Sequence, residues 1–180
     1  MHDQKLIRPV RQWVENFVIG KNLCPFAKRE LGKDRVRFVT TASATVEQLL
    51  IALQTELTLL NSDPSVETTL LIHPDVLQDF DDYNQFLGYA DDLLVEMGLE
   101  GTYQVASFHP DYQFGGTQPN DAENYTNRSP YPMMHVLREA SLERAIADYP
   151  DVDQIPARNI TLMNDVGQAK LQTLLRSCLG

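Results

Sequence analysis

Hydrophobic residues recur along this chain with two different periods, and the two periods alternate. Apolar side chains at intervals of three and four share one face of a helix, whereas short apolar or alternating runs are typical of strands. The helical period predicts helices over residues 7–19, 45–60, 76–97 and 132–149, followed by one or two helices over 155–179. The strand pattern predicts three β-strands, over residues 35–41, 67–73 and 102–109.

Capping and breaking residues support several of these boundaries. Gly20 suits the position after the first helix, whose opening turn tolerates a proline. Thr45 and Gln48 have the spacing of a capping box at the start of the second helix. Gly167 is the expected break within the last helical stretch.

The order of these elements predicts the fold class. Strands that alternate with helices form βαβ units with right-handed crossovers. We therefore expect an α/β fold with a small, mainly parallel sheet of three to four strands, built from βαβαβ units and covered by helices. A ferredoxin-like α+β sheet containing one unrecognised strand is the alternative. The length of 180 residues fits a single domain over 1–180.

Two predicted strands end in the same triplet, His-Pro-Asp, at residues 73–75 and 109–111. Ligands of open parallel sheets bind beyond the carboxyl ends of the strands, so His73 and His109 are candidate catalytic residues. Cys24, in the segment LCPF, is the third candidate. If it reaches the histidines, Cys24 would be a nucleophile, or the three residues would hold zinc or iron. The alternative is that both histidines are hydrogen-bonded loop residues and Cys24 is buried.

The long polar segment between residues 107 and 139 is the expected wall of this site. Ser129 is predicted to cap a helix there, and a helix N-terminus beside Arg128 favours a carboxylate or phosphate. In the alternative interpretation, Arg128 pairs with acids of its own loop. The residues predicted to bind a ligand are Asp111, Tyr112, Asn127, Arg128, Ser129 and His135.

Composition narrows the range of partners. The formal net charge of −10 argues against a nucleic-acid or anionic-membrane partner. No apolar stretch is long enough to span a bilayer, and the N-terminal residues lack the apolar core of a secretory signal. With only two cysteines, we expect a cytoplasmic protein. No nucleotide-binding fingerprint is present.

These observations predict a small enzyme or enzyme-like ligand binder for a small anionic metabolite. Hydrolysis or group transfer is the broadest reaction class that they favour, and the oligomeric state is left open. The alternative is a non-catalytic interaction module that uses residues 110–131 as its docking surface. Its anchors would be four aromatic residues, Tyr112, Phe114, Tyr125 and Tyr131.

Three segments also resemble a known family. The segments are GKNLCPFAK, LLIHPDVLQDFDDYN and ASFHPDYQFGGTQPNDAENYTNRSPYPMMHVLREASLERA. They are similar to a bacterial family catalogued as domain of unknown function 1415, and the similarity extends over nearly all of the chain. The one departure is Gly115–Gly116, where glycine beside alanine is expected. The resemblance implies a bacterial, stand-alone cytoplasmic protein and supplies no activity.

Overall fold

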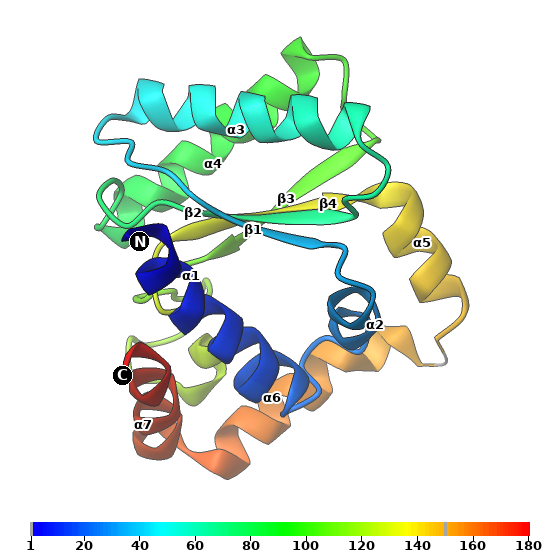
Figure 1. Ribbon diagram of the computed structural model, residues 1–180. Coiled ribbons are helices and arrows are strands. Elements are labelled where there is room, and N and C mark those ends of the chain that lie inside the picture. The colour runs from blue at the N-terminus through cyan, green and yellow to red at the C-terminus, as the bar shows by residue number, and fades with distance from the viewer. Residues whose placement is uncertain (1, 150) are drawn as a thin grey trace.

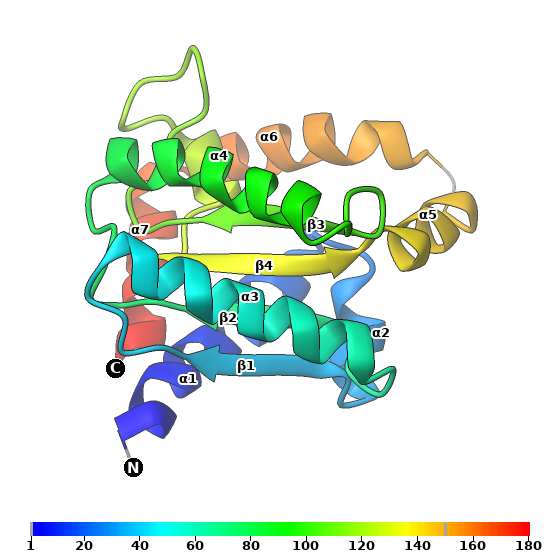
Figure 2. The same cartoon turned by 90° about the horizontal axis from the view of Figure 1, so that it is seen from above.

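A computed structural model describes residues 2–149 and 151–180. It consists of a four-stranded sheet with helices on both faces (Figure 1). The strands lie in the order β1 (Val36–Thr40), β2 (Thr68–Ile72), β4 (Met133–Arg138) and β3 (Tyr103–Phe108). β1 and β2 are parallel, whereas β4 lies antiparallel between β2 and β3 (Figure 2). The predicted α/β class is confirmed.

β4 corrects the sequence prediction, which placed a helix over residues 132–149. Met134 and Val136 belong to the core on one face of the sheet, and Met133 belongs to the core on the other. A strand that is buried on both faces shows no alternation of polar and apolar residues, so the two-residue pattern that identifies a strand is absent from its sequence. The same residues also satisfy helical spacing, and the helix begins only at Glu139.

Because of β4, the sheet is mixed rather than mainly parallel. The alternative was right to expect an additional strand. However, the chain order is β-α-β-α-β-β, which differs from the β-α-β-β-α-β order of a ferredoxin-like fold.

One face of the sheet is covered by α3 (Val46–Ser62) and α4 (Phe80–Glu96) (Figure 1). The predicted cap of α3 is present, because Thr45 Oγ1 accepts a hydrogen bond from the Gln48 backbone N–H. The Gln48 side chain in turn accepts one from the Ala44 N–H. The Asp79 carboxylate caps α4 in the same way, by accepting from the first N–H groups of the helix.

The opposite face is covered by helices from both ends of the chain. α1 (His2–Trp13) continues into a π-helix, η1 (Val14–Ile19), which ends just before Gly20. α6 (Ile155–Val166) and α7 (Gln168–Leu179) are separated by Gly167, as predicted. Two short 3₁₀ helices, η2 (Ala122–Thr126) and η3 (Val152–Gln154), complete the connections.

Two further helices extend this second layer toward the amino ends of β1 and β2. They are α2 (Ala27–Gly32) and α5 (Glu139–Ala147) (Figure 1). α2 contributes no buried residue and α5 contributes only Ala145, so neither packs tightly onto the sheet. Among the described residues, no helix combines the length and the apolar character that crossing a membrane requires.

Candidate ligand-binding site

His73 and His109 lie at the same edge of the sheet, just beyond the carboxyl ends of β2 and β3. Both side chains are fully buried. Their rings flank Tyr83 of α4, with centroid distances of 5.8 Å and 5.2 Å respectively. The sequence therefore predicted their proximity, but not their complete burial.

The ring nitrogens of these histidines are largely occupied by the loops that follow the strands. Nδ1 of His73 lies 3.0 Å from the carbonyl oxygen of Val76. In His109, Nδ1 accepts from the Asp111 N–H at 3.0 Å, so Nε2 carries the proton that it shares with the Leu77 carbonyl at 3.2 Å. Burial lowers the pKa of both rings, that of His73 to about 4, which keeps them neutral at physiological pH.

Tyr83 links the strand ends between the two histidines. Its hydroxyl donates to the Met133 carbonyl at 2.8 Å and accepts from the Phe108 N–H at 3.1 Å. Burial raises the pKa of this phenol above its ordinary value. The histidines and Tyr83 thus form a buried cluster that fixes the ends of β3 and β4.

The loop over residues 109–131 is held together by its own polar side chains. Asn124 is fully buried, and its Oδ1 accepts from the Phe114 N–H at 3.0 Å and from the Thr117 hydroxyl at 2.8 Å. Its amide nitrogen donates to the Gln118 carbonyl at 2.8 Å. Asn127, predicted as a ligand contact, donates to the Ser107 carbonyl at 3.1 Å.

Arg128, the predicted anion clamp, is bonded within its own loop. Arg128 donates to the carbonyl oxygens of Tyr112 and Pro119, and its guanidinium stacks 4.7 Å from the Tyr125 ring centroid. Ser129 caps no helix, because a strand follows it; its buried hydroxyl donates to the Tyr131 carbonyl at 2.7 Å. These bonds stabilise the loop.

The aromatic residues of this loop are turned inward. Tyr125 is only 2% exposed, and Tyr112 packs against Phe80 and Phe114 at centroid distances of 5.1 Å and 4.9 Å. Tyr131 packs against the core of the α1 face. Asp111 is exposed at the surface. The loop therefore presents little of the aromatic surface that a docking role requires.

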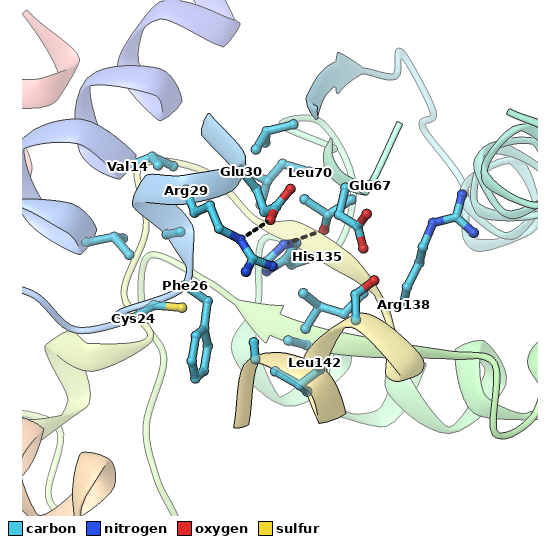
Figure 3. A pocket seen from close by; sticks show the side chains of 18 of the residues that line it. Val14, Cys24, Phe26, Arg29, Glu30, Glu67, Leu70, His135, Arg138 and Leu142 are labelled. Atoms are coloured by element: carbon cyan, nitrogen blue, oxygen red, sulfur yellow. Dashed lines mark hydrogen bonds and ion pairs between the residues drawn. The ribbon is translucent and has the colours of Figure 1, made fainter. Parts of the chain in front are cut away.

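A cavity of about 270 Å³ lies elsewhere, between the sheet and the helices α1, η1, α2 and α5. Its floor is the face of the sheet, formed by Val36, Thr68, Leu70, Ala106, Phe108, His135 and Leu137. Its walls come from the helices and from the segment after η1, and include Trp13, Val18 and Ala145. Val14, Cys24, Phe26 and Leu142 also belong to the walls and are labelled in Figure 3. Most of these side chains are apolar.

His135 lies in the middle of the cavity floor. On β4 it is paired with Leu70 of β2 on one side and with Ala106 of β3 on the other. Its Nε2 lies 2.7 Å from the hydroxyl of Thr68, a hydrogen bond that is dashed in Figure 3. Its ring centroid lies 6.1 Å from that of Phe108. Burial lowers the pKa of His135 to about 4.

The charged groups around the cavity are paired with one another or with backbone carbonyls. Arg29 and Glu30 of α2 form an ion pair at 2.7 Å, and Arg35 forms another with Glu67. One carboxylate oxygen of Glu67 remains buried without a hydrogen-bond partner among the described residues. Arg138 donates to the Tyr103 hydroxyl and to carbonyl oxygens at the end of α3.

Cys24 shares this cavity with His135 and not with the two histidines of the strand ends. Neither His73 nor His109 lines it. Across residues 2–149 and 151–180, no group of three or more histidine, cysteine, aspartate or glutamate side chains is placed to hold a metal ion. Cys24 and His135 were both named as candidates from the sequence, which placed His135 on a helix and did not predict the cavity that they line.

Comparison with known proteins identifies a family without an assigned activity. The family described as "Protein of unknown function (DUF1415)" matches residues 5–173, so the chain belongs to that family. No curated protein and no solved structure gives a significant match.

Proposed function

We propose that this member of the DUF1415 family binds a small, mainly apolar molecule in the cavity between the sheet and helices α1, η1, α2 and α5. The observation that carries the proposal is the cavity itself, which has about 270 Å³ of space and mostly apolar walls. A cavity of about 150 Å³ accommodates benzene, so this one has room for a molecule of two fused rings. Binding sites for small molecules are typically concave and apolar, with a few placed polar groups.

The exposed apolar lining of the pocket supports a ligand. The pocket is open to solvent, and its walls are mostly apolar. A concave apolar surface that faces water is more typical of a binding site than of a packing defect.

The charges around the cavity favour an uncharged ligand over the anion expected from the sequence. Glu30 and Glu67 lie in its wall, and each has a buried carboxylate oxygen without a hydrogen-bond partner among the described residues. Both carboxylates are paired with arginines, Glu30 with Arg29 and Arg35, and Glu67 with Arg35. These charges offset one another, so the cavity wall has no excess positive charge that would attract an anion. Arg128, the expected clamp, is bonded within its own loop.

We assign roles to the predicted site residues accordingly. Cys24 and His135 contact the ligand, because both line the cavity. His73, His109, Asn127, Arg128 and Ser129 act in folding, since each has a polar side-chain atom bonded to a nearby backbone group. Nε2 of His73 is buried without a hydrogen-bond partner among the described residues. We assign no metal to the set of Cys24, His73 and His109, because they do not share a cavity.

Binding of 6-fluoro-2-naphthol, followed by ¹⁹F NMR, tests this proposal. The wild-type protein should broaden and shift the fluorine signal in a saturable manner. Ala106→Leu adds a side chain to the cavity floor and should abolish binding while the protein remains folded. Ala169→Leu, at an exposed position of α7, is the matched control and should bind as the wild type does. Absence of wild-type binding, or unchanged binding by Ala106→Leu, would contradict the proposal.

A further inference from the structure

We infer that the cavity selects a ligand bearing a hydroxyl group, which donates a hydrogen bond to Nδ1 of His135. This inference rests on the proposed function and specifies the chemistry of its ligand. It follows from the hydrogen bonds of Thr68, from the position of His135 in the sheet and from the surroundings of its second ring nitrogen.

The bonds of Thr68 fix which nitrogen of His135 carries the proton. A threonine hydroxyl has a single hydrogen. The Thr68 hydroxyl donates it to the Val136 carbonyl, which can only accept. At its contact with His135 the hydroxyl must therefore be the acceptor, so that Nε2 is the protonated nitrogen. Nδ1 is consequently left with a free lone pair.

The charge state of the ring agrees with this assignment. Burial among apolar side chains disfavours the imidazolium and lowers the pKa of His135 to about 4. At neutral pH the ring is therefore a neutral tautomer with one donor, already used, and one acceptor. A neutral imidazole nitrogen requires a donor from its partner, which a hydroxyl group supplies.

Nδ1 remains accessible within the cavity. Several polar atoms around the cavity are fully buried without a hydrogen-bond partner among the described residues, namely Trp13 Nε1, Glu30 Oε2 and Glu67 Oε1. Nδ1 of His135 is not among these atoms, and the described residues offer it no hydrogen bond. The side chain is also only half-buried, although it lies at the centre of the sheet. Its accessible surface faces the cavity that it lines (Figure 3).

The apolar surroundings of Nδ1 make the cavity selective for ligands that carry a hydrogen-bond donor. Leu70, Ala106 and Phe108 lie around His135 on the floor and offer no side-chain hydrogen-bonding groups. A ligand without a donor would cover Nδ1 and leave it unsatisfied. Burial of an unsatisfied acceptor weakens binding about tenfold or more relative to a ligand that satisfies it. The cavity therefore discriminates an alcohol or phenol from the corresponding ether.

Paired titrations of 6-fluoro-2-naphthol and its methyl ether test the inference. The wild-type protein should bind the naphthol about tenfold more tightly than the ether. His135→Phe retains an aromatic side chain but has no acceptor, so it should bind both molecules with nearly equal affinity. Equal binding of both by the wild type would overturn this inference and leave the proposed function standing. Binding of neither would overturn the proposed function itself.

A second measurement uses only the wild-type protein, in case His135→Phe does not fold. Long-range ¹H–¹⁵N spectra distinguish a protonated from an unprotonated imidazole nitrogen. Without ligand, Nε2 of His135 should be protonated and Nδ1 unprotonated. The naphthol should move the Nδ1 resonance toward that of a hydrogen-bonded acceptor, whereas the ether should not. A proton on Nδ1, or an Nδ1 resonance that is insensitive to the naphthol, would overturn the inference.

Discussion

The hydroxyl of Thr68 on β2 lies 2.7 Å from Nε2 of His135 on the neighbouring strand β4. This contact joins two strands that run in opposite directions and are far apart in the sequence. It holds a polar ring at the floor of a mainly apolar cavity. The orientation of His135, and with it the proposed ligand contact, depends on this hydrogen bond.

Thr68→Val removes the hydroxyl while nearly preserving the shape of the side chain. The Nε2–H of His135 then has no acceptor, so the free energy of unfolding should fall by about 1–3 kcal/mol. Thr55→Val is the matched control, because the Thr55 hydroxyl bonds to the Ile51 carbonyl on an exposed face of α3. The control should change stability by no more than about 0.5 kcal/mol. Urea unfolding measures both, and equal stabilities of the two variants would contradict the role of the contact.

The lowered histidine pKa values predict how stability depends on pH. His73 and His135 have a pKa of about 4 in the folded protein, against an ordinary value of 6.5. The unfolded chain therefore binds more protons between these values, so stability is full above about pH 6.5 and falls as the pH decreases toward 4. A shift of this size corresponds to up to roughly 3 kcal/mol for the fully buried ring of His73, and to less for the half-buried ring of His135.

Carboxylates also make the stability of the protein depend on pH. Substitution of His135 separates the contribution of this histidine from theirs. His135→Phe should lose less stability than the wild type between pH 6.5 and pH 4, whatever its stability at neutral pH. Urea unfolding at a series of pH values provides the comparison. Parallel curves for the two proteins would show that His135 already titrates normally in the folded state.

The loop over residues 109–131 should depend on Asn124 for its structure. Asn124→Ala removes three hydrogen bonds, so the loop should open more often. The Phe114 amide, which donates to Asn124, should then exchange with deuterium faster than in the wild type. Asn120→Ala, at an exposed position of the same loop, should leave that exchange unchanged. If the Phe114 amide exchanged at the same rate in all three proteins, Asn124 would not be needed to hold the loop.

Gly20 should be required for the end of η1. A Cβ atom at this position would lie 2.3 Å from the Asn16 carbonyl oxygen, closer than atoms can approach. Gly20→Ala should therefore displace η1 and cost about 1–3 kcal/mol of stability. It should also weaken binding of 6-fluoro-2-naphthol, because Val14 and Val18 of η1 line the cavity.

Gly32→Ala is the control for this substitution. A Cβ atom at Gly32 meets no other atom within 4 Å, and alanine is the better residue within a helix. Stability should be retained or slightly increased. Thermal unfolding of both variants provides the comparison. If Gly20→Ala were as stable as Gly32→Ala, Gly20 would not be required at the end of η1.

Cys24 should report on occupancy of the cavity. The thiol is partly exposed and lines the cavity, whereas Cys178 is only 4% exposed. Saturating 6-fluoro-2-naphthol should slow alkylation of Cys24 by N-ethylmaleimide, with Cys178→Ser used to remove any background. Mass spectrometry measures the rate. Alkylation of Cys24 at the same rate with and without naphthol would place the ligand elsewhere.

Local signals in the sequence identified most of the fold. Thr45 and Gln48 determine the start of α3, and Gly167 separates α6 from α7. These features depend on neighbouring residues alone. β4 was missed because Met133, Val136 and Leu137 suit a buried strand and an amphipathic helix equally well. Its placement between β2 and β3 is decided by tertiary packing.

The candidate site was harder to predict than the fold. His73 and His109 follow strands and precede prolines, a local pattern that correctly placed them at one sheet edge. Whether they were exposed depended on Tyr83, which lies on a helix between them. The cavity combines residues of α1, α2, α5 and all four strands. No local pattern relates Cys24 to His135, because their common surroundings exist only after the sheet and its second helical layer have assembled.

A crystal structure of the wild-type protein with 6-bromo-2-naphthol, in which anomalous scattering locates the bromine, would show directly whether the cavity binds a ligand. We expect one bromine site inside the cavity, with the naphthol oxygen within hydrogen-bonding distance of Nδ1 of His135. A naphthol bound only outside the cavity, or an empty cavity at saturating concentration, would contradict the proposed function.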